Sequence, residues 1–291
     1  MTEASISPFF RIGPERPVSP VILSIPHAGR AYRPELLRAA RLPQAALETL
    51  EDRLVDRLVW RATANGATAF VARAPRAELD LNRDEREIDP GLIAPPLPSG
   101  NLVQSARTRG GIGLIPSRIT GLGPIWRERV TQAELTRRIE TIHRPYHQAL
   151  EKALAHARTR FGAAILLDCH SMPPRPRTEG GGPGAATVIF GDRHGTTTTP
   201  DLLDAAVTAA GQLGYRTACN TPYAGGYIAG RHGQPRRGVH ALQIELDRSL
   251  YLDRDLRAPG PGFEGVCRLI AAVASALEER LLAYPDAIAA E

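Results

Sequence analysis

Four short hydrophobic runs in the sequence each lead directly into a cluster of polar side chains that are capable of chemistry. The runs are rich in Ile, Val and Leu, which is typical of buried strands in an α/β sheet. In open α/β sheets, ligands bind outside the carboxyl ends of the strands, so we expect the polar clusters to meet at one edge of one sheet. The runs cover residues 20–25, 78–81, 163–167 and 241–244, and the clusters after them contain His27, Asn82-Arg83-Asp84, Asp168-Cys169-His170-Ser171 and Glu245-Leu246-Asp247-Arg248.

The rest of the pattern predicts helices that alternate with these strands. Helical spacing is clearest over 131–161, where Pro145 is expected to kink or divide the helix. Two segments rich in Gly and Pro, at about 90–123 and 173–184, lack clear periodicity and are predicted to be loops at the active edge. No repeat or linker interrupts the chain, so a single α/β domain over residues 1–291 is expected. Further helices are predicted at 34–45, 47–63, 201–213 and 263–282, and further strands at 67–72 and 186–190.

Composition narrows the classes of protein to which the chain can belong. Hydrophobic residues make up 43% of the 291 residues, which is enough for a substantial core, yet no apolar stretch approaches the length of a transmembrane helix. The first residues lack the basic and apolar regions of a signal peptide. Three cysteines, Cys169, Cys219 and Cys267, are too few for a disulfide framework. We therefore expect a cytoplasmic protein that does not act at a membrane.

The positive charge of the chain comes almost entirely from arginine. The net charge is +5, the pI is about 9.4, and Lys152 is the only lysine. Basic residues alternate with acidic ones, as in Arg83-Asp84-Glu85-Arg86-Glu87, and no aromatic-basic motif of an RNA-binding module is present. Nucleic acid is therefore not an expected partner. A locally positive site for a small anionic substrate accounts for the charge equally well.

Two histidines occupy matching positions, each just after a predicted strand. Neutral imidazole is the commonest zinc ligand, and a catalytic zinc site uses three protein ligands and keeps one position open. His27 and His170 are therefore predicted to bind a metal ion. The third ligand should be a carboxylate, and Asp52, in the predicted helix after the first strand, is preferred. The alternatives for this ligand are Glu51, Asp56 and Asp168. Asp168 shares a strand face with His170, so it can orient that ring instead of binding the metal itself.

A carboxylate and an arginine at two other strand ends complete the predicted site. Glu245 lies in the apolar run Leu242-Gln243-Ile244-Glu245-Leu246, where an unpaired carboxylate would be costly. A general base beside a metal ion is the functional interpretation, and a buried ion pair is the alternative. Asn82-Arg83 can form an ordinary turn. An arginine beside a metal is nevertheless well suited to bind a substrate carboxylate through two parallel hydrogen bonds.

Two other patterns resemble functional motifs without matching them. His143 and His147 stand four residues apart in a predicted helix, as zinc-binding pairs do, but no HExxH motif is present and Pro145 lies between them. Packing and hydrogen bonding are the favoured interpretation of this pair. The run Gly180-Gly181-Gly182-Pro183-Gly184 lacks the Lys-Ser/Thr of a phosphate-binding loop.

Taken in order, several segments of the chain resemble the N-formylglutamate amidohydrolase family over residues 21–252. The matching segments are Ser24-Ile25-Pro26-His27-Ala28-Gly29, Asp80-Leu81-Asn82-Arg83, Pro145-Tyr146-His147, Leu167-Asp168-Cys169-His170-Ser171-Met172-Pro173, Asn220-Thr221-Pro222-Tyr223-Ala224-Gly225-Gly226-Tyr227, and Leu242-Gln243-Ile244-Glu245-Leu246 with Leu250-Tyr251. The resemblance implies a zinc-exopeptidase-like α/β fold, a three-layer α/β/α sandwich around a mostly parallel or mixed central sheet. It also implies the following site residues: metal ligands His27, Asp52 and His170, a carboxylate-binding pair Asn82-Arg83, and a catalytic glutamate Glu245.

On this basis the chain is predicted to be a zinc amidohydrolase with one Zn²⁺ ion per chain. Its expected reaction cleaves the amide of an N-acyl amino acid, N-formyl-L-glutamate, to formate and glutamate. Zinc activates the water, Glu245 moves the proton, and a second arginine, Arg231 or Arg175, pairs with the side-chain carboxylate. A related N-acyl amino acid deacylase or carboxypeptidase-like enzyme is the alternative among enzymes. A non-catalytic binder of acidic metabolites is the alternative from another class, and it has no need of stoichiometric zinc.

Overall fold

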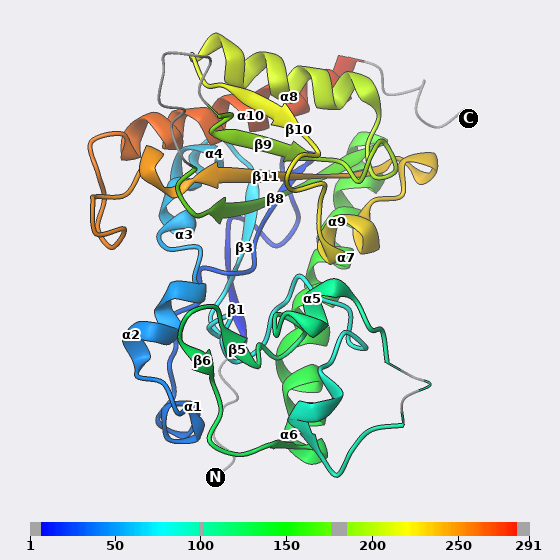
Figure 1. Ribbon diagram of the computed structural model, residues 1–291. Coiled ribbons are helices and arrows are strands. Elements are labelled where there is room, and N and C mark those ends of the chain that lie inside the picture. The colour runs from blue at the N-terminus through cyan, green and yellow to red at the C-terminus, as the bar shows by residue number, and fades with distance from the viewer. Residues whose placement is uncertain (1–6, 99, 101, 176–184, 284–291) are drawn as a thin grey trace. The chain divides into compact units, whose positions relative to one another are not determined.

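The computed structural model describes residues 7–98, 100, 102–175 and 185–283 (Figure 1). Within these residues the chain forms two compact units, each built from several segments. The first unit contains residues 7–10, 26–51 and 71–149, and the second contains residues 11–25, 52–70 and 150–283. The single domain over residues 1–291 stays a prediction. Most of the predicted loop at 173–184, including the glycine-rich run from residue 180 to 184, lies outside the described residues.

A seven-stranded mixed sheet is the main β-structure of the chain. In spatial order its strands are β1 (Phe9–Ile12), β3 (Thr68–Ala72), β2 (Val21–Ile25), β8 (Ala164–Met172), β11 (Val239–Asp247), β9 (Val188–Gly191) and β10 (Thr217–Cys219). β8 pairs in parallel with β2 on one side and with β11 on the other, whereas β9 is antiparallel to β11 and β10 is parallel to β9. Every residue of β2 and β8 is buried, as expected for apolar strands that helices cover on both faces.

Helices pack against this sheet and against one another. The long helix α10 (Phe263–Ala283) contacts β2 and β8 and packs along α8 (Pro200–Gln212). Two short helices, α3 (Val55–Leu58) and α4 (Trp60–Ala64), also contact α10, while α9 (Tyr227–His232) contacts β11 and β8. The buried residues of α10 recur every three or four positions, which gives the helix one apolar face. The predicted α/β fold with a mostly parallel or mixed central sheet is confirmed.

Short elements make up most of the first unit. The predicted loop at 90–123 contains several of them, so it is not one structureless segment. Beyond the parts of β1 and β3 that fall in it, the described elements of this unit are α1 (Pro34–Ala39), α2 (Gln44–Leu47), the 3-10 turns Glu48–Leu50 and Pro90–Leu92, β4 (Ile93–Ala94) paired with β7 (Val130–Thr131), α5 (Ala106–Arg109), β5 (Arg118–Ile119) paired with β6 (Gly123–Pro124), α6 (Gln132–Arg138), the π-helical turn Ile139–His143 and the beginning of α7 (Arg144–Phe161). Two further 3-10 turns, Pro235–Arg237 and Arg248–Leu250, belong to the second unit.

Two predicted helices are shorter than the sequence pattern indicates. The helix predicted at 34–45 ends at Ala39, and a new helix, α2, begins only after Pro43. The helix predicted at 47–63 is interrupted, because Glu51 is extended and Leu54 has a positive φ of 63°. The interruption divides the segment into the 3-10 turn before Asp52 and the helices α3 and α4 after it.

The helix predicted at 131–161 has an irregular turn in its middle. Residues Ile139–His143 form a π-helical turn between α6 and α7, immediately before the first turn that contains Pro145. Proline has no N–H to donate to the preceding turn, so a change in the hydrogen-bond pattern here has a direct cause. The two remaining predicted helices are confirmed as α8 and α10, and Gly214 follows α8 with a φ of 82°, as a helix C-terminus requires.

The strand predicted at 78–81 is wrong. Residues 76–78 form a turn, and the chain stays irregular up to Asn82. The segment is nevertheless buried, because its carboxylates are ion-paired: Glu78 bonds to Arg33 and Arg137, and Asp80 bonds to Arg76. Ion pairs compensate the buried carboxylates of such a segment, so its burial does not require that it form a strand.

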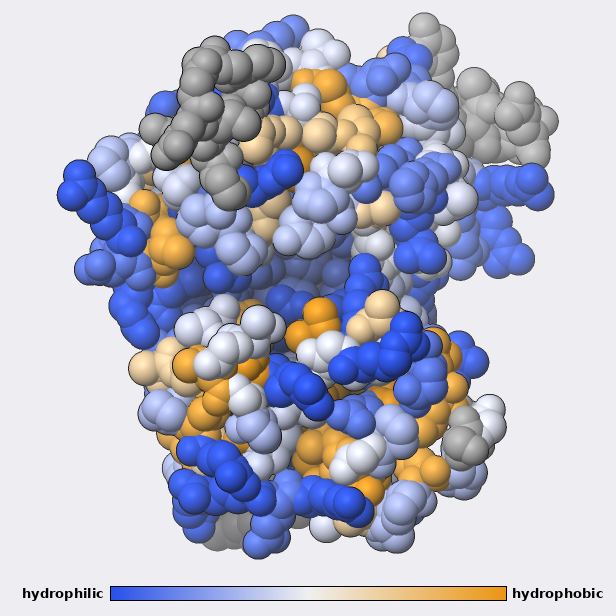
Figure 2. All heavy atoms as spheres, viewed as in Figure 1, coloured by the Kyte–Doolittle hydropathy of each residue, from blue (hydrophilic) through white to orange (hydrophobic). Residues whose placement is uncertain are grey.

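Hydrophilic side chains cover most of the face seen in Figure 2, with hydrophobic patches between them. None of the helices in the described part of the chain combines the length and the apolar character that crossing a bilayer requires. The cysteines are not disulfide-bonded: Cys169 and Cys267 are buried, and Cys219 is exposed.

Candidate active site

The second halves of β8 and β11 place four polar side chains on one face of the sheet. The two strands pair in parallel with Asp168 opposite Gln243 and His170 opposite Glu245. Residues two positions apart in a strand point to the same face, so all four side chains share it. All four are buried. Both strands extend beyond the apolar runs that predicted them, and the polar residues therefore lie within the strands rather than after them.

Two carboxylates hold the imidazole of His170 at its two nitrogens. His170 Nδ1 lies 3.1 Å from Asp52 Oδ2, and His170 Nε2 lies 2.8 Å from Asp168 Oδ2. Burial by itself would disfavour the charged ring, but Asp168, Asp52 and Glu245 outweigh it and raise the pKa of His170 well above its usual value. The surroundings of this ring therefore favour a cation at its nitrogens.

Asp52 lies in the extended break before α3, so its predicted position on a helix is wrong. The residue is only 1% exposed, and it follows the extended residue Glu51 at the end of the 3-10 turn Glu48–Leu50. Asp52 Oδ1 accepts a hydrogen bond from Arg248 Nη2 at 3.2 Å, and Arg248 Nε donates to Ser171 Oγ at 3.2 Å. The charge of the buried carboxylate is thus compensated by an arginine at one oxygen, while the other oxygen faces His170.

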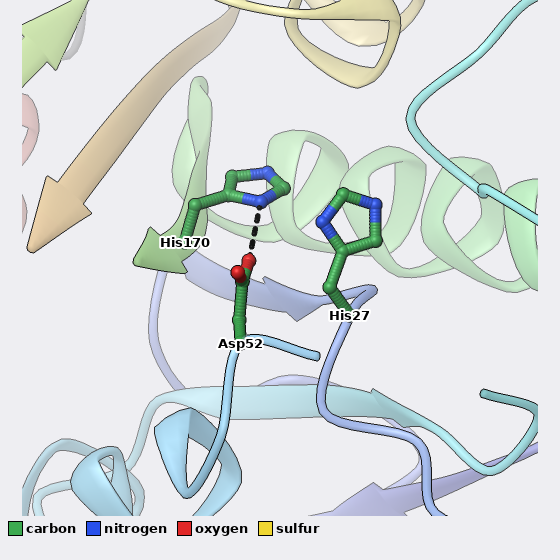
Figure 3. A group of neighbouring side chains, drawn as sticks. All are labelled: His27, Asp52 and His170. Carbon is green, nitrogen blue, oxygen red and sulfur yellow. Dashed lines mark hydrogen bonds and ion pairs between the residues drawn. The ribbon is translucent and has the colours of Figure 1, made fainter. Parts of the chain in front are cut away.

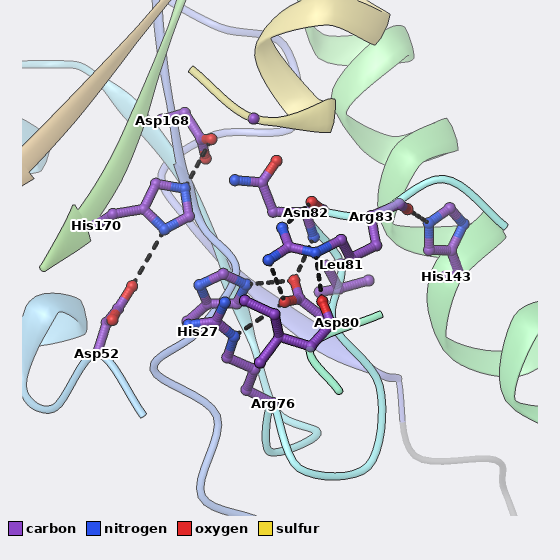
Figure 4. A network of polar contacts seen from close by, with 12 residues as sticks. His27, Asp52, Arg76, Asp80, Leu81, Asn82, Arg83, His143, Asp168 and His170 are labelled. Carbon is purple, nitrogen blue, oxygen red and sulfur yellow. Dashed lines mark hydrogen bonds and ion pairs between the residues drawn. The ribbon is translucent and has the colours of Figure 1, made fainter. Parts of the chain in front are cut away.

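His27 follows β2 by two residues and is held by a completely buried aspartate. His27 Nε2 lies 2.7 Å from Asp80 Oδ1, and the same oxygen accepts the backbone N–H of Asn82 at 2.9 Å (Figure 4). Asp80 Oδ2 accepts a hydrogen bond from Arg76 Nε at 2.9 Å and lies 3.6 Å from Arg83 Nη2. Burial would raise the pKa of the Asp80 carboxyl, but Arg76, Arg83 and His27 hold it well below its usual range.

His27, Asp52 and His170 form a group in which one ligand atom of each residue lies within 4.8 Å of the others (Figure 3). All three side chains are buried, and two imidazole nitrogens with one carboxylate oxygen can hold a metal ion. Nε2 of each histidine is bonded to a buried aspartate, so Nδ1 is the nitrogen through which each ring could contact a metal ion. The alternative third ligands that the sequence offered, Glu51, Asp56 and Asp168, are not members of this group.

Glu245 is tied to a glutamine on its own strand. Gln243 Nε2 donates a hydrogen bond to Glu245 Oε1 at 2.8 Å, and Gln243 Oε1 accepts the backbone N–H of Gly226 at 2.8 Å. The amide therefore fixes one carboxylate oxygen of Glu245 and anchors the start of α9 to the same point. Asp247, two positions further along β11, accepts the backbone N–H groups of Ser249 and Arg175 at 2.8 Å each.

Arg83 lies in the turn that follows Asp80, so its predicted position at a strand end is wrong. The residue is only 5% exposed, and its side chain is held by protein acceptors. Its Nε donates to the carbonyl of Ile112 at 2.8 Å, and its Nη1 donates to the carbonyl of Asn82 at 2.7 Å. Burial lowers the pKa of Arg83, opposed by Asp80. Arg83 and Asn82 are thus fixed together beside the aspartate that holds His27.

The two arginines predicted to bind a second carboxylate, Arg231 and Arg175, belong to the second unit and bond to other protein groups. Arg231, on α9, donates to Tyr227 Oη and to Glu151 Oε1 at 2.8 Å each. Arg175 Nη1 donates to the carbonyl of Ala186 at 3.4 Å. A substrate contact for either arginine stays a prediction.

The i, i+4 histidine pair is used for packing and hydrogen bonding. His143 Nε2 lies 2.9 Å from the carbonyl oxygen of Arg83, and His147 Nε2 lies 3.0 Å from that of Leu81. Both rings are buried, with ring centroids 4.4 Å apart. The pair therefore supports the turn that carries Asn82 and Arg83, and it does not belong to the metal-ligand group.

Three residues at the site occur in the segments that the sequence analysis quotes but receive no role there: Asp80, Gln243 and Arg248. The alternation of side chains along a strand predicts that Gln243 lies on the same face as Glu245, because the two residues are two positions apart. No local signal identifies Asp52 as the partner of Arg248, since their bond joins residues 196 positions apart. Asp80 is equally hidden, because its bond to His27 spans 53 positions and the segment around it is not a strand.

The chain matches known proteins over most of its length. A family model described as N-formylglutamate amidohydrolase matches residues 19–252. The N-formylglutamate deformylase of Pseudomonas aeruginosa is 30% identical over 271 residues, which cover 91% of this chain and 93% of the relative. The enzyme of the same name from Pseudomonas putida is 30% identical over 243 residues, which cover 80% of this chain and 82% of the relative.

A solved structure extends the similarity to three dimensions. The crystal structure of N-formylglutamate amidohydrolase from Ralstonia eutropha JMP134 is 34% identical to this chain and superposes with a TM-score of 0.85. The alignment covers 95% of this chain and 99% of that chain. Sequence and fold are therefore similar to the same proteins over nearly the whole chain.

Proposed function

Because this chain belongs to the N-formylglutamate amidohydrolase family, and is thus a hydrolase of amide bonds, we propose that it cleaves N-formyl-L-glutamate to formate and glutamate with one zinc ion per chain. The observation that carries the proposal is the buried group of His27, Asp52 and His170, together with Glu245 opposite His170 in the sheet. A non-catalytic binder of acidic metabolites would need neither the three ligands nor the buried glutamate.

The metal ligands of the proposed site are His27, Asp52 and His170. The donor set fits zinc, since two imidazoles and one carboxylate leave a coordination position open for catalysis. The aspartates at Nε2 of both rings, Asp80 and Asp168, also fit, because they fix the tautomer and orientation of a metal-binding histidine. When bound, zinc acts as a Lewis acid that polarises the amide carbonyl and makes a water molecule easier to deprotonate.

Glu245 serves as the general base and then as the general acid. Its carboxylate accepts a proton from the attacking water as the new C–O bond forms at the formyl carbon. It then delivers this proton to the amide nitrogen as the C–N bond breaks, so the products are formate and the free amino group of glutamate. Gln243 supports this role because its amide leaves the carboxylate one fixed orientation.

Asn82 and Arg83 bind the α-carboxylate of the substrate. A guanidinium presents parallel N–H groups that match a carboxylate, and a rigidly held arginine loses little conformational entropy on binding. Arg83 is held in this way by the carbonyls of Ile112 and Asn82. Orientation of the substrate by its carboxylate is a main source of rate enhancement in such a reaction.

The test combines metal analysis with a substrate screen. His27→Ala and His170→Ala should each lose the zinc that the purified wild-type protein contains, whereas His156→Ala, a change at an exposed histidine, should keep it. The wild type should release formate from N-formyl-L-glutamate faster than it releases acid from other N-acyl amino acids. Full zinc retention in both site variants would refute the ligand assignment, and a zinc-loaded protein without hydrolytic activity would favour the binder.

A further inference from the structure

Asp52, the proposed carboxylate ligand of the metal, lies outside every helix and strand, so its position depends on contacts with other parts of the chain. Two residues that follow β11 supply such contacts. Arg248 Nη2 donates to Asp52 Oδ1 at 3.2 Å, and the hydroxyl of the completely buried Tyr251 donates to the carbonyl of Arg53 at 2.9 Å. The segment after β11 therefore holds both the side chain of Asp52 and the backbone beside it.

Arg248 is itself oriented by a neighbour of another proposed ligand. Its Nε donates to Ser171 Oγ at 3.2 Å, and Ser171 follows His170 in β8. A guanidinium is planar, so contacts at Nε and at Nη2 together fix the orientation of the whole group. The side chain of Arg248 is 14% exposed and that of Asp52 is 2% exposed. The ion pair is therefore largely shielded from solvent, where salt screens it little.

The two oxygens of the Asp52 carboxylate face different groups. Oδ2 lies 3.1 Å from His170 Nδ1, the nitrogen through which that ring can contact a metal ion (Figure 3). Oδ1 instead accepts the hydrogen bond from Arg248. A carboxylate can bind a metal ion through one oxygen or through both. A guanidinium at Oδ1 repels a second cation there, so the structure leaves Oδ2 as the oxygen suited to a metal.

We propose that Arg248 is a positioning residue that restricts Asp52 to binding the metal ion through one oxygen, Oδ2. The proposal rests on the proposed function, because it requires a metal ion at the group of His27, Asp52 and His170. A catalytic zinc site with three protein ligands keeps a position for water and can expand to five-coordinate in the transition state. A second oxygen from Asp52 would fill the position that the amide carbonyl needs in order to be polarised. Arg248 thus keeps a coordination position available to the substrate.

Cobalt(II) in place of zinc tests this assignment, because the visible absorption of Co²⁺ weakens as the number of coordinated atoms rises. Arg248→Met removes the guanidinium and keeps an unbranched apolar side chain. The variant should bind Co²⁺ as the wild type does but absorb more weakly, since both oxygens of Asp52 then bind the metal. In its zinc form, kcat/KM for N-formyl-L-glutamate should fall by about 10- to 100-fold, as is typical when a partner of a metal ligand is removed.

Arg280→Met is the matched control, because Arg280 pairs with Asp201 at 2.9 Å in the same unit. This variant should keep the Co²⁺ absorption and the kcat/KM of the wild type. Arg248→Lys keeps a positive charge beside Asp52 but lacks the planar group that bonds to both Asp52 and Ser171. Its absorption should therefore lie between those of the wild type and Arg248→Met. If circular dichroism shows that Arg248→Met does not fold, Arg248→Lys decides the question by the same measurement.

Two results would overturn the assignment and leave the proposed function intact. One is an unchanged Co²⁺ absorption in the folded Arg248 variants, and the other is the loss of Co²⁺ from them. A wild type that binds neither Co²⁺ nor Zn²⁺ would refute the proposed metal site, and this inference with it.

Discussion

Asp168 Oδ2 lies 2.8 Å from His170 Nε2, two residues further along the same face of β8. Asp80 Oδ1 has the same relationship to His27 Nε2 at 2.7 Å, although it reaches the ring from a turn and not from a strand. The other oxygen of Asp168 has no hydrogen-bond partner in the described part of the chain. The burial of Asp168 is therefore explained by its bond to the histidine rather than by a wider structural network.

Asp168→Asn should weaken zinc binding while the protein remains folded. An amide is a poorer acceptor than a carboxylate, so the His170 ring loses basicity and orientation, and such changes beside a metal-binding histidine typically cost about 10- to 100-fold in metal affinity. Competition with a chelator measures the affinity, and circular dichroism checks the fold. Unchanged zinc affinity would show that Asp168 has no part in orienting the ligand.

Glu245→Gln should bind zinc and substrate but turn over slowly. The proposed general base contributes about 10²- to 10⁴-fold in rate, so kcat should fall by that amount while KM changes little. Asp247→Asn is the comparison variant, because Asp247 holds backbone N–H groups of Ser249 and Arg175 and should matter for local structure rather than for proton transfer. Near wild-type kcat in Glu245→Gln, with Asp247→Asn inactive, would move the role to Asp247.

Arg83→Ala should lower kcat/KM for N-formyl-L-glutamate. The corresponding loss of transition-state stabilisation should be about 2–4 kcal/mol, the value expected for a charge-assisted pair with a carboxylate. The loss should shrink for the substrate whose α-carboxylate is replaced by an amide, because that contact is then absent. The variant also removes the hydrogen bonds that Arg83 donates to the carbonyls of Ile112 and Asn82, so its thermal stability must be measured in parallel. Equal losses on the acid and the amide would place the carboxylate anchor elsewhere.

The sequence predicts the parts of this site that lie on regular elements and misses those that depend on distant contacts. The apolar runs of β2, β8 and β11 locate the sheet, and strand alternation places His170 and Glu245 on a shared face. These predictions succeed because the strands are buried on both sides, which produces a continuous hydrophobic signal.

Local patterns fail where burial of a charge comes from pairing over long distances. The run at 78–81 reads as a strand, but ion pairs to Arg33, Arg137 and Arg76 bury it as an irregular segment. Asp52 shows the converse, since it joins the proposed ligand group although the helix predicted to carry it is interrupted there. Neither the arginine partner of Asp52 nor the break before α3 has a periodic signal in the sequence.

His240 should make the protein less stable in mild acid. The residue is completely buried near the start of β11, its Nδ1 lies 3.5 Å from Thr198 Oγ1, and burial lowers its pKa to about 4, with Asp201 opposing the shift. In the unfolded chain a histidine titrates near its ordinary pKa of about 6.5, so the unfolded state binds more protons between these two values. Stability is therefore constant above the unfolded pKa and falls as pH is lowered from about 6.5 to about 4, by roughly 3 kcal/mol in total.

His240→Leu should remove this part of the acid sensitivity. The substitution deletes the titrating group, and His240 Nε2 has no hydrogen-bond partner in the described part of the chain that the change would sacrifice. Urea unfolding of wild type and variant at pH 7.5 and pH 5 gives the difference directly, and the wild type should lose about 2 kcal/mol more than the variant between these values. Exposed His156, changed to Gln, is the control for a histidine that burial does not affect. If His240→Leu and wild type lose stability equally, His240 is solvated or protonated in the folded state, and the acid sensitivity arises at other groups.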